Sequence, residues 1–107
     1  MTRVWYDEKG DTLRLFISGH AGFNSNGGDI VCAAASALGF ALLGFLEQRD
    51  NGGEIDCDWL VESGRLDITA TRNAETDIAF EMTMIGLCQL ERKYPDNVRV
   101  TIGSPRG

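Results

Sequence analysis

The stretch that decides the fold is IVCAAASALGFALLGFL, residues 30–46, which carries no charged side chain. Asp29 directly before it is a good N-cap residue, so we predict a helix that begins here. Polar residues followed by Gly52 and Gly53 end it. A helix that is apolar on all sides is buried in the middle of a fold, or buried partly against a second subunit.

We weighed a membrane-spanning role for residues 30–46 and do not favour it. A bilayer needs about 20 apolar residues. This stretch is shorter, rich in alanine and glycine, and lacks basic flanking residues. Residues 1–10 carry mixed charges and lack the apolar segment of a secretory signal. We therefore predict a cytoplasmic protein with reduced thiols and without a membrane partner.

Alternating apolar residues on both sides of this helix predict strands. Strands are predicted at residues 3–6, 13–18, 55–61, 66–70 and 98–102, and a second helix at about residues 75–93. Gly10 with Asp11, and Ser63 with Gly64, are typical of tight hairpin turns. The order ββαββαβ lacks a βαβ alternation. It favours one α+β domain over residues 1–107, with two helices packed on an antiparallel or mixed sheet.

The composition limits the class of partner. The 107 residues are 43% apolar, which suffices for one core without disulfide support. The 16 acidic residues outnumber the 10 basic ones, and the net charge is −6. Nucleic-acid binding needs clustered Lys and Arg, so we predict no nucleic-acid partner. An acidic surface favours a basic peptide instead.

The chain has one histidine, His20, at the end of the second predicted strand, and Cys32 follows in the first turn of the predicted helix. The positive end of a helix favours a thiolate, and a nearby imidazole can act as its base and acid. The helix N–H groups also offer a site for an oxyanion. The residues alone leave a second interpretation open, in which Cys32 is a small buried residue of an alanine-rich helix.

Glycines surround this pair of residues. Their spacing fits no phosphate-binding loop, so we interpret them as hinges of a lid over His20 and Cys32. Ser36 lies one turn after Cys32 on the same helical face. Its hydroxyl either orients a substrate or the imidazole, or bonds back to the Cys32 carbonyl, which we favour slightly. The residues assigned to the lid or to substrate binding are Gly19, Gly22, Phe23, Gly27, Gly28, Asp29 and Ser36.

The remaining cysteines predict no second site. Cys57 and Cys88 fall on the apolar sides of a strand and a helix, so we expect core thiols. With His20 and Cys32 they match the inventory of a zinc site. The chain lacks a C-x₂-C pair, however, and the ligands would come from four separate elements. We therefore predict no metal and no cofactor. Trp5 and Trp59 are expected to pack on strands.

Two motifs together resemble the Prp family of ribosomal-processing cysteine proteases. They are GHAG at residues 19–22 and DIVCAA at residues 29–34, the second followed by Ser36. The length and element order of the family also cover essentially the whole chain. The sequence departs from the family pattern at residues 23–28, FNSNGG, where a tyrosine and charged residues are common, and at Ala35, where we expect valine.

The resemblance implies an α+β homodimer in which His20 and Cys32 form the catalytic pair. Family members remove a short N-terminal extension from a bacterial ribosomal large-subunit protein, and they cleave after an aromatic residue. We accordingly expect a cysteine endopeptidase that acts on a basic ribosomal-protein tail. The uncharged helix, residues 30–46, is expected to form part of the dimer interface. The alternative is a non-catalytic ribosome- or assembly-associated binding module of the same fold.

Overall fold

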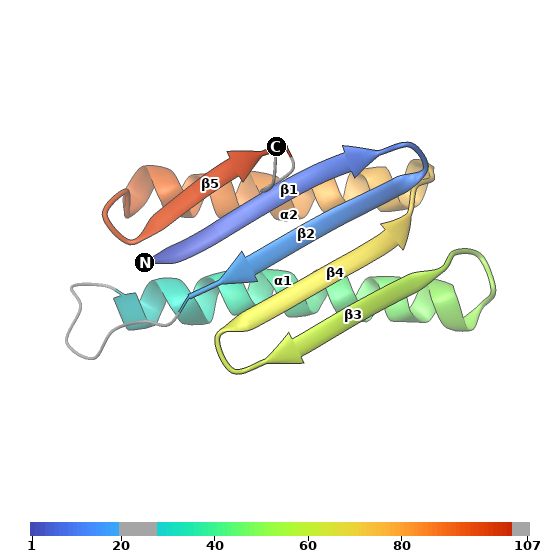
Figure 1. Cartoon of the computed structure of the whole chain (residues 1–107), viewed down its shortest axis with the longest axis horizontal. Coiled ribbons are helices and arrows are strands. Elements are labelled where there is room, and N and C mark those ends of the chain that lie inside the picture. The colour runs from blue at the N-terminus through green and yellow to red at the C-terminus, as the bar shows by residue number, and fades with distance from the viewer. Residues whose placement is uncertain (20–27, 104–107) are drawn as a thin grey trace.

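The computed structural model describes residues 1–19 and 28–103. The elements in chain order are β1 (Thr2–Lys9), β2 (Thr12–Ser18), α1 (Gly28–Asn51), β3 (Cys57–Glu62), β4 (Arg65–Thr71), α2 (Ala74–Lys93) and β5 (Val98–Ile102). The predicted α+β class and the order ββαββαβ are confirmed. Both helices lie on the same side of the sheet, as Figure 1 shows, and the described residues place no helix on its other face.

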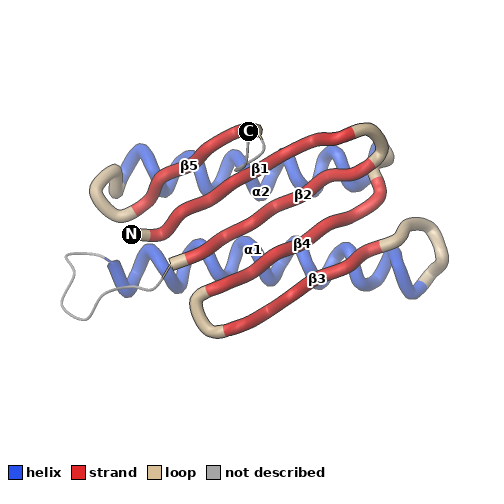
Figure 2. Tube along the Cα trace, viewed as in Figure 1, coloured by secondary structure: helices blue, strands red, loops and turns tan. Residues whose placement is uncertain are grey.

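The five strands form one mixed sheet. Their spatial order is β3-β4-β2-β1-β5, and Figure 2 shows β3 and β5 at its two edges. All neighbours are antiparallel except β1 and β5, which run parallel. Both predicted hairpin turns are present, because Lys9 pairs with Thr12 and Glu62 pairs with Arg65. This order places β4 directly beside β2, although the whole of α1 separates them in the chain.

The core lies between the sheet and the two helices. Alternate residues of β2 and β4 point into it, and in the register Leu15 lies opposite Ile68. Phe80 of α2 is fully buried and is among the largest such side chains. The buried strand residues of this layer are Val4, Leu13, Leu15, Ile17, Leu66, Ile68, Ala70 and Val98. Removing this apolar surface from water is the main favourable contribution to folding.

Only one side of α1 belongs to the core. The prediction that this helix is buried in the middle of the fold is wrong, because the two helices form a single layer and the described residues supply no layer outside it. Its buried positions include Val31, Ala35, Leu42 and Leu46. Its exposed positions include Ala33, Ala37, Phe40, Ala41 and Gly44. Burial of this outer side against a second subunit therefore stays a prediction.

Gly39 marks the closest approach of α1 to the sheet. It is buried, and a Cβ atom there would overlap the side chain of Leu66 on β4.

By length and composition alone, Ile30–Asn51 could cross a membrane. Its packing on β2 and β4, through residues such as Val31 and Leu46, is that of a core helix.

β3 differs from its predicted pattern. It begins at Cys57, and the exposed fractions of Trp59 and Val61 are 47% and 45%. The prediction that Trp59 packs in the fold is therefore wrong, because an edge strand has neighbours on fewer sides. Trp5 does pack, with its ring 5.1 Å from that of Phe16 between centroids.

α2 begins with a capping box. Asn73 Oδ1 accepts a hydrogen bond from the Thr76 backbone N–H at 2.8 Å, and Thr76 Oγ1 accepts one from the Asn73 N–H at 2.7 Å. These bonds satisfy amides that the first helical turn leaves without partners. The helix ends at Lys93, after which the Tyr94 N–H bonds to the Leu90 carbonyl at 2.8 Å.

The core position of Phe80 predicts a large loss of stability on truncation. Phe80→Ala should lower the free energy of unfolding by about 3–5 kcal/mol, because it leaves a cavity between α2 and the sheet. Ile102→Ala is the matched control, since Ile102 is 67% exposed, and it should change stability by less than about 0.5 kcal/mol. Urea denaturation measures both. Equal losses in the two variants would contradict the assignment of the core.

Candidate active site

Cys32 lies near the start of α1, slightly deeper in the helix than predicted. The helix begins at Gly28, so Asp29 lies inside the first turn and the prediction that it is the N-cap is wrong. The backbone at Gly28 is already helical, which moves the helix start toward the N-terminus. The N–H groups of residues 28–30 have no i−4 acceptor within the helix. Helical side chains tilt toward the N-terminus, so Cys32 remains beside these amides.

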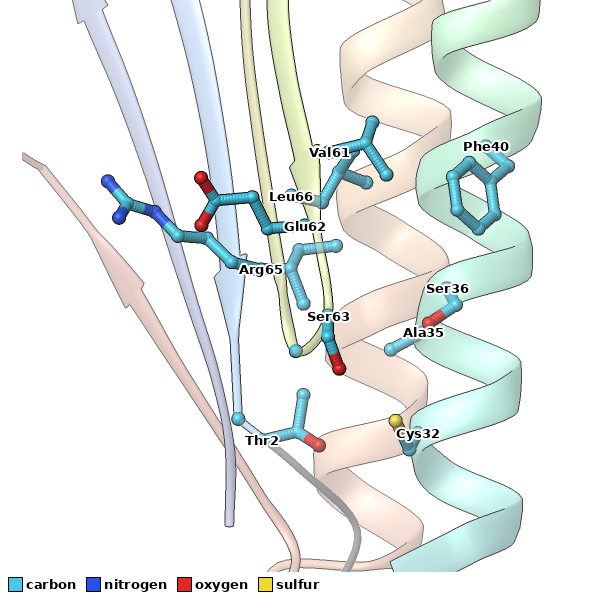
Figure 3. A pocket seen from close by; sticks show the side chains of 13 residues that line it. Thr2, Cys32, Ala35, Ser36, Phe40, Val61, Glu62, Ser63, Arg65 and Leu66 are labelled. Atoms are coloured by element: carbon cyan, nitrogen blue, oxygen red, sulfur yellow. The ribbon is translucent and has the colours of Figure 1, made fainter.

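A cavity of about 280 Å³ opens next to Cys32. It lies between the first turns of α1, the end of β2, the start of β1 and the turn that joins β3 to β4. Figure 3 shows the Cys32 sulfur on the side of α1 that faces Thr2 and Ser63. The lining residues are Thr2, Ile17, Gly19, Cys32, Ala35, Ser36, Phe40, Val61, Glu62, Ser63, Gly64, Arg65 and Leu66.

Gly19 anchors the end of β2 at this cavity. Its N–H donates a hydrogen bond to the Gly64 carbonyl at 2.9 Å, which ties β2 to the β3–β4 turn. Its φ of +122° lies in the region that favours glycine. A Cβ atom on this residue would overlap the backbone carbonyl oxygen of Met1. The site therefore requires glycine immediately before His20 in the chain.

The structure brings Gly19, Cys32 and Ser36 together around one cavity. On α2, the Thr83 hydroxyl donates a hydrogen bond to the Ala79 carbonyl one turn earlier, at 2.8 Å. This is the kind of bond predicted for Ser36 and the Cys32 carbonyl. Gly28 and Asp29 lie at the start of α1. Four predicted site residues lie outside the described ranges, namely His20, Gly22, Phe23 and Gly27.

Sequence reasoning missed most of the cavity wall. Phe40 could have been found, because positions 32, 36 and 40 repeat every helical turn and share one face of α1. Val61 and Ser63 could not, since they reach the site only because β4 pairs with β2. Thr2 is buried at the start of β1 and closes the cavity from the other side.

The other two cysteines lie away from this cavity wall. Cys57 is buried, and its pKa is raised to about 11, first by burial and then by the carboxylates of Asp50, Asp58 and Glu47. A thiol in this state is protonated and unreactive at neutral pH. Cys88 is half-buried rather than a full core residue, so that prediction holds for Cys57 only.

Comparison with known proteins identifies the family. Residues 1–99 match the model of the family described as cysteine protease Prp. The chain belongs to the Prp family. Its relatives are cysteine proteases, so the cavity beside Cys32 lies in a protease fold.

Two Prp relatives show the extent of the match. The ribosomal processing cysteine protease Prp of Staphylococcus aureus (strain Mu50) is 28% identical over 107 residues, covering 91% of this chain and 92% of the relative. The Prp of Bacillus subtilis (strain 168) is 33% identical over 96 residues, covering 83% and 84%. The likeness thus extends over nearly the full length of both proteins.

Solved structures share the same fold. Prp from S. aureus in complex with a substrate peptide aligns with a TM-score of 0.77 at 23% identity, covering 95% of this chain and 99% of that one. The same enzyme with a covalently linked product peptide aligns with a TM-score of 0.73 at 24% identity, with the same coverage. Both support the arrangement of sheet and helices described above.

The environments of the thiols predict selective labelling. Iodoacetamide at neutral pH should modify Cys32, which lines the cavity, and leave Cys57 unmodified, because Cys57 is buried and protonated. Peptide mass spectrometry before and after unfolding in urea measures both rates. Unfolding should abolish the difference. Equal labelling of Cys32 and Cys57 in the folded protein would contradict the prediction.

The contact at Gly19 predicts that alanine is not tolerated there. Gly19→Ala should destabilise the fold by about 1–3 kcal/mol more than Gly103→Ala. Both glycines have a positive φ, but a Cβ atom at Gly103 would meet no atom within 4 Å. Gly103→Ala therefore reports the conformational strain alone. Thermal unfolding of the two variants tests this, and equal midpoints would rule out the overlap with the Met1 carbonyl.

Proposed function

We propose that this chain is a cytoplasmic cysteine endopeptidase that removes a short N-terminal extension from a bacterial ribosomal large-subunit protein. Cys32 is the nucleophile, and His20 is the general base and acid. One observation carries the proposal: in a Prp-family chain, the cavity beside Cys32 is also lined by Gly19, the residue directly before the single histidine. The named relatives are ribosomal processing proteases.

In this proposal the reaction has two steps. His20 accepts the thiol proton as the Cys32 sulfur attacks the scissile carbonyl carbon, and it then donates that proton to the leaving amine. The product of this step is a thioester between Cys32 and the N-terminal part of the substrate. Water then attacks the thioester while His20 accepts its proton, and the new carboxyl end leaves as the thiol re-forms.

The amides of the first turn of α1 are the proposed oxyanion donors. The N–H groups of residues 28–30 have no i−4 acceptor within the helix and carry the positive end of its dipole. A tetrahedral oxyanion formed on Cys32 would gain charge-assisted hydrogen bonds from them. Removing one such donor typically lowers the rate about 10²–10³-fold, because the oxyanion of the tetrahedral intermediate loses a hydrogen bond.

The cavity wall suits a peptide. Phe40, Val61 and Leu66 supply an apolar side that could hold the aromatic residue after which the family cleaves. Phe40 and Val61 are 51% and 45% exposed, so contact with a bound side chain would cover apolar surface. The net charge of −6 favours a basic ribosomal-protein tail.

The proposal also covers the oligomeric state, the lid, the cofactors and the binding partners that we expect from the sequence. The enzyme acts as a homodimer, and the lid residues Gly22, Phe23 and Gly27 take part in substrate binding. It uses neither a metal nor another cofactor, since thiol chemistry needs only a base and oxyanion donors. It binds no nucleic acid and no membrane.

Removal of either member of the pair predicts loss of cleavage. Cys32→Ala and His20→Ala should each lower turnover at least about a thousandfold, because nucleophile and base act as a unit. Cys57→Ala is the matched control, and it should retain cleavage because Cys57 lies in the core. Mass spectrometry of the ribosomal protein incubated with each variant measures the product, and circular dichroism checks the fold.

The result also separates the protease from the binding module. Retained turnover in Cys32→Ala would overturn the assignment of the nucleophile. A binding module would hold the ribosomal protein without cutting it, and its Cys32 would label no faster than Cys88. Cleavage by the wild-type chain together with selective labelling of Cys32 would exclude that alternative.

A further inference from the structure

The outer edge of β3 has no neighbouring strand among the described residues, because β3 is the last strand of the sheet on its side. The Thr71 N–H of β4 donates a hydrogen bond to the carbonyl of Asp56, directly before β3, at 3.0 Å. Residues that bond to the neighbouring strand alternate along an antiparallel ladder, so every second residue from Asp56 onward bonds to β4. The backbone N–H and C=O groups of Trp59 and Val61 therefore point away from β4.

The opposite edge of the sheet is closed. The Val100 N–H of β5 donates a hydrogen bond to Glu91 Oε2 of α2 at 2.7 Å, which occupies the middle of that edge. Blocking an edge with a charged side chain is a common protection against further strands. β3 instead exposes Trp59, Leu60 and Val61, with exposed fractions of 47%, 40% and 45%. An apolar edge with such backbone groups is the surface to which an extended peptide adds as a strand.

This edge leads directly into the cavity beside Cys32. Val61 and Glu62, at the end of β3, line the cavity, and Figure 3 shows Val61 on the side of the hairpin that faces Phe40 of α1. Trp59 lies two residues before Val61, so it continues the same face of β3 away from the cavity. An extended peptide that passes Cys32 can therefore continue along the edge of β3.

Carboxylates surround the far end of this edge. Glu47, Asp50 and Asp58 all raise the pKa of the Cys57 thiol, so they lie around the start of β3. Asp56 is exposed beside them. The ion pairs of the described residues involve none of these four carboxylates. A strand that adds to β3 therefore meets negative charge at the end remote from the cavity, which favours a basic strand.

We propose that the part of the substrate that follows the scissile bond adds to the outer edge of β3 as an antiparallel strand, with its basic side chains beside Asp58 and Asp56. The inference rests on the proposed function, in which the short extension precedes the scissile bond and the basic ribosomal-protein tail follows it. β3 runs toward the cavity, so a chain that leaves the cavity along β3 runs antiparallel to it. At about 3.4 Å per residue, roughly the third to sixth residues after the bond reach the two carboxylates.

The same carboxylates select a basic peptide over a second β3 strand. Like charges that lie opposite each other destabilise a strand pair, and opposite charges stabilise it. Two β3 edges would bring the Asp58 and Glu62 side chains of both copies into one sheet. A basic peptide brings opposite charges to the same positions, while its backbone pairs with Trp59 and Val61.

Reversal of one charge tests the contact. Asp58→Lys should raise KM about five- to tenfold for a peptide with lysines at the third to sixth positions after the scissile bond, because attraction across the strand pair becomes repulsion. The value of kcat should stay unchanged. Glutamates in place of these lysines should reverse the preference, so that Asp58→Lys has a lower KM than the wild type. Asp96→Lys is the matched control, since the exposed Asp96 precedes β5 at the opposite edge. It should cleave both peptides like the wild type.

The peptide itself tests the direction and the pairing. With the lysines moved to positions before the scissile bond, the wild type and Asp58→Lys should have equal KM values. N-methylation of single amides, from the second residue after the bond onward, should lower kcat/KM about threefold to tenfold at every second position only. The reason is that alternate N–H groups of an added strand face β3. Losses that do not alternate, or unchanged cleavage of the basic peptide by Asp58→Lys, would overturn the proposal.

Binding separates this inference from the catalytic proposal. Fluorescence anisotropy of the labelled basic peptide with Cys32→Ala measures docking without cleavage, and adding Asp58→Lys should weaken it about five- to tenfold. The same dependence in a wild-type chain that cleaves nothing would refute the proposed function and leave the docking standing. Cleavage that is insensitive to Asp58→Lys would refute the docking and leave the catalytic pair standing. Circular dichroism checks the fold of each variant.

Discussion

The close packing of α1 on β2 and β4 is the contact on which the rest of the structure depends. At Gly39 the helix backbone approaches the side chains of Ile17 and Leu66 so closely that a Cβ atom would not fit. This contact holds the N-terminal turns of α1 beside the end of β2. Cys32 and Gly19 consequently line the same cavity. A helix packed farther out would widen that cavity and move the thiol away from the strand end.

One-sided burial has a second consequence for the molecule. Because both helices cover the same face of the sheet, each presents its outer side to solvent. On α1 that side carries alanines together with Phe40, and on α2 it carries Ile78, Met82 and Ile85. A surface of this kind would be a liability for a monomer.

The cavity itself is assembled from segments that are distant in the chain. Gly19 directly follows β2, Cys32 lies near the start of α1, and Ser63 lies in the β3–β4 turn. The bond from Gly19 to Gly64 joins two of these segments directly. A ligand that filled the cavity would contact all three segments, so the shape of the site depends on the pairing of β4 with β2 as well as on α1.

Local patterns in the sequence were sufficient for the elements and for part of the site. Alternation gave the strands, the uncharged run gave α1, and the spacing of Cys32 and Ser36 placed both on one helical face, because these features depend on neighbours in the chain. Burial and contacts between distant segments could not be read this way. Whether α1 is covered on one side or all round, and whether Trp59 packs, depends on the number of layers and on which strand lies at the edge.

The sequence by itself therefore determined the class of fold, the order of its elements and the place of Cys32 near the start of the first helix. Only the tertiary structure decided that Phe40, Val61 and Ser63 line the cavity, that Gly19 must be glycine, and that α2 exposes Ile78, Met82 and Ile85. The physical reason is the range of the interactions. Helix and strand formation depend on side chains a few residues apart in the chain. Cavities and exposed faces depend on how whole helices and strands pack against one another and on which of their faces remain in contact with water.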